Sequence, residues 1–269
     1  MYLVIYLRYN RGMKEEQSLV NYERGGFRTD LSKRILEPEE IITGEEGEKY
    51  ANRKDDRTLT YSMVARDIVE RLGMNERSRV MEVCCGSGQL AHFLREMTGA
   101  YIVATDGGKE LVDAATSKYG GEGIEFRQLD VHGATDGDFD FVICKDSFHH
   151  FTDPVQSIKD MFRLLKDGGK IYIFDLVRSC DPEQIDYRQK VMQIDAEAKR
   201  FLQSVNASLT PEEMKSVAIG SAVIDVEVIY PMQYSEDNIE EHKEIIERDS
   251  TKEYLLDKLF AVYILTKKI

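Results

Sequence analysis

The 269-residue chain has no tryptophan, five prolines and four cysteines, and these scarcities exclude several classes of protein. Cys84, Cys85, Cys144 and Cys180 show neither a C-x-x-C pair nor the spacing of a disulfide framework. Few prolines and a hydrophobic content of 42% are typical of a packed globular chain, not of a disordered or fibrous one. The composition therefore predicts a folded protein of the reducing cytoplasm.

Long hydrophobic runs and an excess of positive charge are also missing. The longest uncharged apolar run near the N-terminus is 1–7, far short of the ~20 residues of a membrane-spanning helix, and no small-residue cleavage site follows it. The 36 Lys and Arg against 49 Asp and Glu leave a formal net charge of −13, which disfavours nucleic-acid phosphates and anionic lipid surfaces as partners. We therefore expect no signal peptide, no membrane insertion and no nucleic-acid partner.

From about residue 60 onward, short apolar runs alternate with amphipathic stretches. A helical pattern of apolar residues begins at Tyr61 and ends at Leu72, before Gly73. Further helices are expected at 89–97, 109–118 and 155–165, and strands at 80–84, 101–105, 124–128, 139–144, 170–175, 226–230 and 260–266. Strands that alternate with helices predict a parallel sheet covered on both faces.

After the fifth predicted strand the pattern changes. Residues 181–205 carry apolar side chains at alternating spacings of four and three, which predicts an inserted amphipathic helix. Another helix is expected to begin at Thr210, which caps it, with Pro211 in the first turn. The charged stretch 235–257 is expected to be helical, and the first 58 residues, rich in charge and glycine, are the least readable part.

A glycine turn, Cys85-Gly86-Ser87-Gly88, joins the first predicted strand to the next helix. Glycines remove the Cβ atoms that keep a ligand from the backbone, and a helix start presents unpaired N–H groups. Gly86, Gly88 and Ala91 satisfy a loose G-x-G-x-x-A dinucleotide fingerprint. Asp106 ends the next strand, where a carboxylate is placed to accept both ribose hydroxyls. These residues predict a nucleoside ligand and leave a nicotinamide dinucleotide open.

Five ordered motifs decide between nucleosides. They are Val80–Gly88, Ile102–Asp106, Phe126–Val131, Phe139–Pro154 and Leu164–Gly169. With them the chain resembles the class I S-adenosylmethionine-dependent methyltransferases, in the subgroup similar to ubiquinone and menaquinone biosynthesis methyltransferases, over roughly 60–178 and again at 210–230 and 260–268. The resemblance implies S-adenosyl-L-methionine as cofactor. A nicotinamide-binding alternative leaves Glu82, Asp130 and the His149-His150 segment without roles.

The resemblance also implies which residues form the site. It assigns the ribose to Asp106 and the adenine amino group to Asp130, while Cys84 stands where the family usually has glycine. The expected cofactor-binding set is Glu82, Cys84, Gly86, Gly88, Asp106, Gly107, Asp130, Val131 and Lys145. His149 and His150 are the candidate catalytic residues, although this pair is often structural in the family. They lack a spaced acid or cysteine partner, so no metal site is expected.

The implied fold is α/β: a Rossmann-like, doubly wound seven-stranded sheet with the last strand antiparallel and a helical cap. We expect an N-terminal cap segment at 1–58 and a methyltransferase domain at 59–269, with cap insertions at 179–206 and 231–258. Tyr22, Tyr50 and Tyr61 are candidates to cover the cofactor or to fill the cap. The inserted helix is expected to govern acceptor choice or to serve as a dimer contact.

The implied reaction moves a methyl group onto an O, N, C or S atom of a small-molecule acceptor. A peptide- or protein-modifying methyltransferase, whose cap would be an open groove, is the first alternative. A nicotinamide-dependent oxidoreductase or a catalytically silent cofactor-binding subunit is the second. A homodimer stays open.

Overall fold

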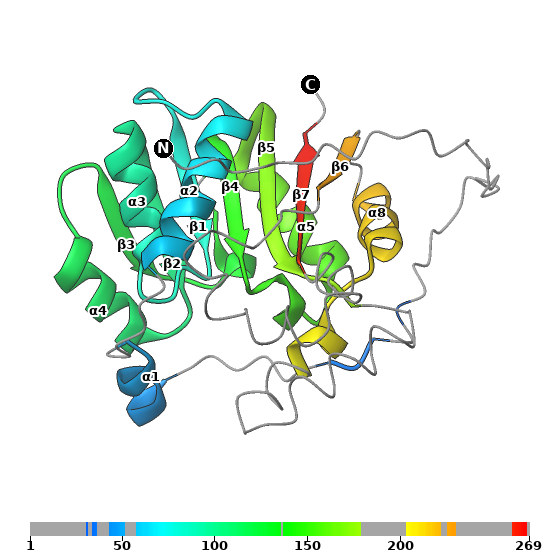
Figure 1. Cartoon of the computed structure of the whole chain (residues 1–269), viewed down its shortest axis with the longest axis horizontal. Coiled ribbons are helices and arrows are strands. Elements are labelled where there is room, and N and C mark those ends of the chain that lie inside the picture. The colour runs from blue at the N-terminus through cyan, green and yellow to red at the C-terminus, as the bar shows by residue number, and fades with distance from the viewer. Residues whose placement is uncertain are drawn as a thin grey trace, which may run out of the picture.

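The computed structural model describes residues 31, 34–36, 43–51, 58–135, 137–178, 203–221, 225–229 and 260–267. Within these ranges, seven strands form one sheet in the order β3-β2-β1-β4-β5-β7-β6 (Figure 1). The strands are β1 (Arg79–Val83), β2 (Tyr101–Asp106), β3 (Ile124–Gln128), β4 (Phe139–Lys145), β5 (Leu165–Leu176), β6 (Asp225–Ile229) and β7 (Phe260–Thr266). β1 to β5 are parallel, and β7 lies between β5 and β6, antiparallel to both. The predicted seven-stranded sheet and its antiparallel last strand are confirmed.

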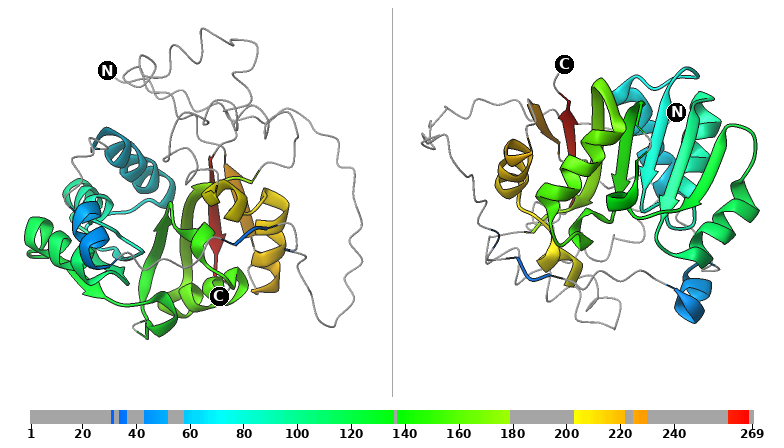
Figure 2. Two further views of the ribbon diagram at one scale, coloured as in Figure 1. Left: turned by 90° about the horizontal axis from the view of Figure 1, so that it is seen from below. Right: turned by 180° about the vertical axis from the view of Figure 1, so that it is seen from behind.

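Helices cover both faces of this sheet (Figures 1 and 2). They are α1 (Gly44–Ala51), α2 (Thr58–Leu72), α3 (Gln89–Thr98), α4 (Lys109–Tyr119), α5 (Pro154–Leu164) and α8 (Pro211–Gly220), with short 3₁₀ turns η1 (Val131–Gly133) and η2 (Phe148–His150). α2, α3 and α4 pack with one hydrophobic cluster, whereas α5 and α8 pack with the other. α1 contacts α4. The alternation of strands and helices read from the sequence thus yields the layered fold that it predicts.

The central strand β1 shows why its sequence is almost wholly apolar. Successive side chains of a strand point to opposite faces, and Val80 lies in one hydrophobic cluster while Met81 lies in the other. Both side chains are completely buried. A strand covered on both faces needs apolar residues at every position. Glu82, also buried, is therefore the exception that calls for an explanation.

The start of α8 agrees with its predicted signals. The Thr210 hydroxyl accepts a hydrogen bond from the Glu213 backbone at 3.2 Å, and the Glu213 carboxylate accepts one from the Thr210 backbone at 2.9 Å. Pro211 occupies the first turn. This reciprocal pair satisfies two N–H groups that a helix start leaves unbonded. Residues 203–207 are helical, but most of the predicted helix 181–205 and the stretch 235–257 lie outside the described residues.

β5 is longer than the strand predicted at 170–175. Its pairing with β4 shifts register, since Phe139 is opposite Leu165 and Phe141 is opposite Lys170. The intervening residues, with Gly168 at a φ of 76°, form an irregularity that keeps the chain in the sheet. The sequence signals of a turn were correct locally, but pairing with β4 absorbed that turn into the strand.

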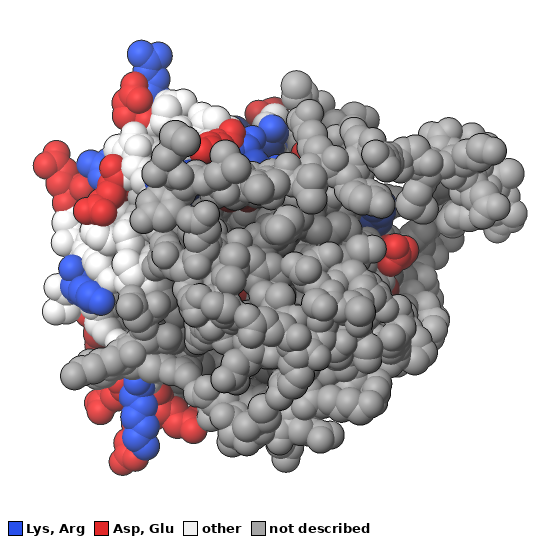
Figure 3. All heavy atoms as spheres, in the orientation of Figure 1, with Lys and Arg blue, Asp and Glu red and all other residues white. Residues whose placement is uncertain are grey.

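The described surface has mixed charge. On the face in Figure 3, Lys and Arg side chains of the described residues stand among Asp and Glu side chains. No helix in the described part of the chain combines the length and the apolarity needed to span a bilayer. The same ranges hold no group of three or more His, Cys, Asp or Glu side chains arranged to bind a metal ion.

Candidate functional site

A cavity of about 260 Å³ lies at the carboxyl ends of the parallel strands. The chain order reverses between β1 and β4, and ligands of open α/β sheets bind at such a point. Of the residues expected from the sequence, those at the cavity wall are Glu82, Cys84, Gly86, Asp106, Gly107, Asp130, Val131, Lys145 and His150. Tyr50 of α1 and Tyr61 of α2 also line it, whereas Tyr22 lies outside the described residues. The structure thus brings together residues that are up to 100 positions apart in the chain.

The two glycines of the turn after β1 have different roles. Gly86, with φ 52°, lines the cavity, and the nearest atom to a Cβ built on it is a Tyr50 ring carbon 3.9 Å away. Gly88, with φ 78°, is buried instead, and a Cβ there would lie 2.6 Å from the Phe126 ring. Gly86 therefore opens the backbone to a ligand, whereas Gly88 permits close packing at the start of α3 and does not line the cavity.

Cys84 occupies the position where the family usually has glycine, and its backbone explains that preference. Its φ is 56°, a left-handed conformation that costs a residue with a Cβ free energy. Burial raises the pKa of the Cys84 thiol, and the carboxylates of Asp106 and Asp130 raise it further. The thiol therefore remains protonated at neutral pH and lines the cavity as a small neutral group.

Asp106 connects the turn after β1 to the turn after β2. Its Oδ2 accepts a hydrogen bond from the Gly86 backbone and its Oδ1 one from the Gly108 backbone, each at 2.8 Å. Burial raises the pKa of Asp106, while these backbone donors act in the opposite direction. Each carboxylate oxygen has a second lone pair, so Asp106 is able to order both turns and still accept hydrogen bonds from a ligand.

Two buried carboxylate oxygens at the cavity lack a hydrogen-bond donor. Among the described residues nothing donates to Glu82 Oε2 or Asp146 Oδ1. Glu82 is 3% exposed, and burial raises its pKa to about 8, against the opposing effect of Lys145. A buried acceptor without a donor destabilises a protein by roughly 1–3 kcal/mol. Both oxygens are thus placed to receive hydrogen bonds from a ligand.

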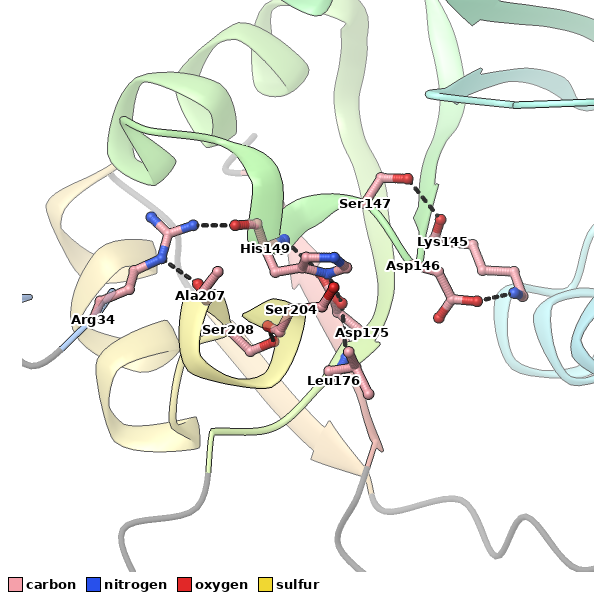
Figure 4. A network of polar contacts seen from close by, with 10 residues as sticks. All are labelled: Arg34, Lys145, Asp146, Ser147, His149, Asp175, Leu176, Ser204, Ala207 and Ser208. Carbon is pink, nitrogen blue, oxygen red and sulfur yellow. Dashed lines mark hydrogen bonds and ion pairs between the residues drawn. The ribbon is translucent and has the colours of Figure 1, made fainter. Parts of the chain in front are cut away.

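Lys145 places a cation at the end of β4. Its ammonium pairs with the Asp146 carboxylate (Figure 4) and lies 4.4 Å from the centre of the Tyr61 ring. Contact with an aromatic face stabilises a desolvated cation. Asp146, with φ 51°, turns the chain sharply after the strand. This arrangement gives the cavity wall one ammonium group beside several carboxylates.

The loop after β3 contributes a residue that sequence reasoning missed. His132 lines the cavity two positions after Asp130, whose Oδ1 accepts a hydrogen bond from the His132 backbone at 2.8 Å. The His132 ring bonds through Nδ1 to the buried Asp160 of α5, which also accepts a hydrogen bond from Gln156 at 2.7 Å. Its position directly after the Asp130-Val131 motif was the only available signal.

The two neighbouring histidines face different surroundings. His149 is 4% exposed and bonds through Nδ1 to Asp175 Oδ1 at 2.6 Å, so it is buried behind the wall. His150 lines the cavity, and the two ring centres are 4.1 Å apart. Of the two candidate catalytic residues, the structure therefore brings only His150 to the cavity.

Comparisons with known proteins agree with this geometry. Residues 81–173 match the family model described as a methyltransferase domain. Methyltransferase GfsG of Streptomyces halstedii is 30% identical over 116 residues, which are 41% of this chain and 42% of that protein. Ubiquinone biosynthesis O-methyltransferase of Xanthomonas euvesicatoria pv. vesicatoria is 34% identical over 107 residues, 38% of this chain and 44% of that protein. The chain thus spans less than half the length of these two relatives.

The fold is also found in solved structures. The plantazolicin methyltransferase BpumL, in complex with SAH, superposes with a TM-score of 0.59 at 16% identity, covering 83% of this chain and 94% of that one. At this identity the likeness concerns the fold. The matched motifs of residues 81–173, the doubly wound sheet and the strand-end cavity agree, and this chain belongs to the class I S-adenosylmethionine-dependent methyltransferases.

Proposed function

We propose that the protein transfers a methyl group from S-adenosyl-L-methionine to an O, N, C or S atom of a small-molecule acceptor. The observation that carries this proposal is the strand-end cavity, where an open glycine backbone faces buried acceptor oxygens without donors. When bound, S-adenosylmethionine supplies an electrophilic methyl group on a sulfonium. A neighbouring fold in complex with SAH supports the same assignment.

The residues present fit this cofactor. Its ammonium, ribose and adenine amino groups are donors, and Glu82 Oε2 and Asp146 Oδ1 are buried acceptors that lack one in the described part of the chain. The carboxylates of Asp106 and Asp130 stand on the same wall. Several carboxylates beside the single ammonium of Lys145 favour a ligand of net positive charge.

We assign the wall residues to parts of the cofactor by their place along the strands. Asp106 and Gly107 would hold the ribose, and Asp130 with Val131 the adenine. Glu82, Cys84, Gly86 and Lys145, at the ends of β1 and β4, would hold the methionine portion. Gly88 contributes by packing α3 rather than by contact with the ligand.

Catalysis then requires alignment, exclusion of water and, for an alcohol or phenol, removal of a proton. Tyr50 and Tyr61 stand at the cavity wall on the side of α1 and α2, where they keep water out. His150 is the imidazole placed to accept a proton from the acceptor. His149, bonded to Asp175 and stacked near His150, holds that turn without touching the cavity.

The size of the cavity favours a small acceptor over a peptide. A volume of about 260 Å³ is near the lower end of the roughly 300–1,000 Å³ of small-ligand sites. A peptide substrate would need an open groove. The name of one relative refers to ubiquinone biosynthesis, and a phenolic acceptor would use a base such as His150.

Calorimetry and a labelled methyl donor test the proposal. We expect S-adenosylmethionine and S-adenosylhomocysteine to bind with micromolar affinity and NAD to give no heat. Incubation with methyl-labelled S-adenosylmethionine should label a small-metabolite pool and not a peptide pool. Heat with NAD and none with S-adenosylmethionine would refute the cofactor assignment, and label confined to peptides would refute the acceptor assignment.

A further inference from the structure

The turn that carries His150 is anchored on one side by β5. The Asp175 carboxylate accepts hydrogen bonds from the His149 backbone at 2.7 Å and from the Leu176 backbone at 2.7 Å, and it contacts His149 Nδ1 at 2.6 Å (Figure 4). Asp175 is 3% exposed. These contacts fix the first half of the turn, the part that precedes His150.

On the other side the turn is held by Arg34, from the segment that precedes α1. Its Nη2 donates to the carbonyl of His149, and its Nη1 donates to the carbonyl of Phe151 at 2.7 Å. These two carbonyls flank His150 in the chain. Arg34 is 7% exposed, and its guanidinium therefore grips the turn from within the protein.

The same guanidinium connects this turn to the helical residues 203–207. Arg34 Nε donates to the Ala207 carbonyl (Figure 4), and the Ile35 backbone donates to the Asn206 carbonyl at 3.1 Å. One side chain thus joins three segments that are 115 and 173 residues from it in sequence. Only the planar fork of a guanidinium offers donors in three fixed directions, so lysine cannot replace this contact set.

The charges around Arg34 are balanced. Asp175 and Glu213 attract its guanidinium, whereas Arg178 repels it. Arg178 is 8% exposed, pairs with Glu213 and donates through Nε to the Ser208 carbonyl at 3.1 Å. The two arginines therefore share burial and a charge cluster, but the printed side-chain contacts to the His149–Phe151 turn are those of Arg34.

We propose that Arg34 is a positioning residue for the acceptor side of the site: by holding the carbonyls on both sides of His150, it fixes that imidazole at the cavity wall. The segment before α1 is then a functional part of the site and not only a cover. This inference rests on the proposed function, in which His150 faces the acceptor. It assigns no contact between Arg34 and any ligand.

The test compares Arg34→Lys with Arg178→Lys in the full chain. Both variants keep the charge and disturb the same buried cluster, so the second is a matched control. Four quantities are measured: the melting temperature, the S-adenosylmethionine affinity by calorimetry, the ring NMR signals of His150 (assigned by their loss in His150→Gln) and the rate of label transfer to the small-metabolite pool.

We expect Arg34→Lys to shift the His150 signals and to lower turnover about ten- to a hundredfold, since small misplacements of a reacting group have effects of this size. Cofactor affinity should stay within about threefold, because Arg34 is absent from the cavity wall. Arg178→Lys should lower the melting temperature similarly, leave the His150 signals in place and keep most of the turnover.

Unmoved His150 signals with full turnover in Arg34→Lys would overturn the proposal, as would equal losses of turnover in both variants. If Arg34→Lys does not fold, Arg34→Gln, which retains an uncharged donor group, takes its place. Failure of both Arg34 variants to fold while Arg178→Lys folds would show a purely structural role. Absence of S-adenosylmethionine binding by the unaltered protein would refute the proposed function instead, while the NMR comparison would still decide the role of Arg34.

Discussion

The two sides of the cavity are built in different ways. The side formed by β1, β2 and β3 takes its wall from residues within 82–132, each at a strand end or in the turn that follows. The side around η2 depends on Asp175 of β5, on Arg34 and on residues 203–208. The first side follows from local motifs, whereas the second is assembled by contacts between distant segments. We therefore expect substitutions on the first side to affect cofactor affinity and those on the second to affect turnover.

Gly86→Val should have the largest effect and tests the first side. A branched side chain at φ 52° is strained and projects into the cavity beside Tyr50. We expect S-adenosylmethionine affinity to fall more than about a hundredfold, which corresponds to roughly 2.7 kcal/mol. Gly121→Val is the control, because a Cβ at Gly121 meets nothing within 4 Å. Equal affinities in the two variants would show that the turn does not contact the cofactor.

Asp106→Ala should come next. Loss of the carboxylate removes the proposed ribose acceptor and the hydrogen bonds that Gly86 and Gly108 donate to it. We expect a loss of ~1.5–3 kcal/mol in cofactor binding, about ten- to a hundredfold in affinity. Asp106→Asn, which keeps one acceptor oxygen, should lose less. Unchanged calorimetric affinity in a folded Asp106→Ala protein would contradict the assignment.

His150→Gln tests the second side. The amide can form hydrogen bonds but cannot act as a base, so turnover should fall about tenfold or more for an acceptor that must lose a proton. Cofactor affinity should change less than about threefold, since His150 is assigned to the acceptor. His92→Gln, on α3 and away from the cavity, serves as the control. A loss of affinity as large as the loss of turnover would remove the distinction between the two sides.

The elevated pKa of Glu82, about 8 because of burial, predicts a pH-dependent stability. Between its ordinary value of 4.5 and about 8, the folded protein retains a proton that the unfolded chain releases. The free energy of unfolding therefore falls as pH rises through this window, with a contribution from Glu82 of about 1.4 kcal/mol per pH unit. Denaturant titrations of the ligand-free protein at pH 5, 6 and 7 should show this decline, flattened in Glu82→Gln. Parallel profiles would contradict the burial of the ionisable group.

Cys84→Gly should have the smallest effect. At φ 56°, glycine relieves backbone strain but gains entropy in the unfolded chain. We expect a net stabilisation of about 0.5–1 kcal/mol, detectable as a higher denaturation midpoint, with little change in affinity. A destabilised variant would show that packing of the Cys84 side chain outweighs the strain.

The sequence by itself determined most of the sheet and of the cofactor side. Strand and helix periodicities located β1 to β4 and α2 to α5 within a few residues, because burial on both faces leaves a direct apolar signature. The glycine turn and Asp106 were readable because their chemistry depends on neighbouring backbone. The pairing of β4 with an extended β5 was not, since a register shift depends on which strands meet.

Only the tertiary structure separated the roles of similar residues. Gly86 and Gly88 look alike in sequence, but the proximity of Phe126 assigns the second to packing. His149 and His150 are adjacent, yet Asp175 draws the first behind the wall and leaves the second at the cavity. Arg34 carried no sequence signal, because its partners are backbone carbonyls of residues more than a hundred positions away. Backbone groups are the same for every residue type, so contacts to them become visible only once the chain is folded.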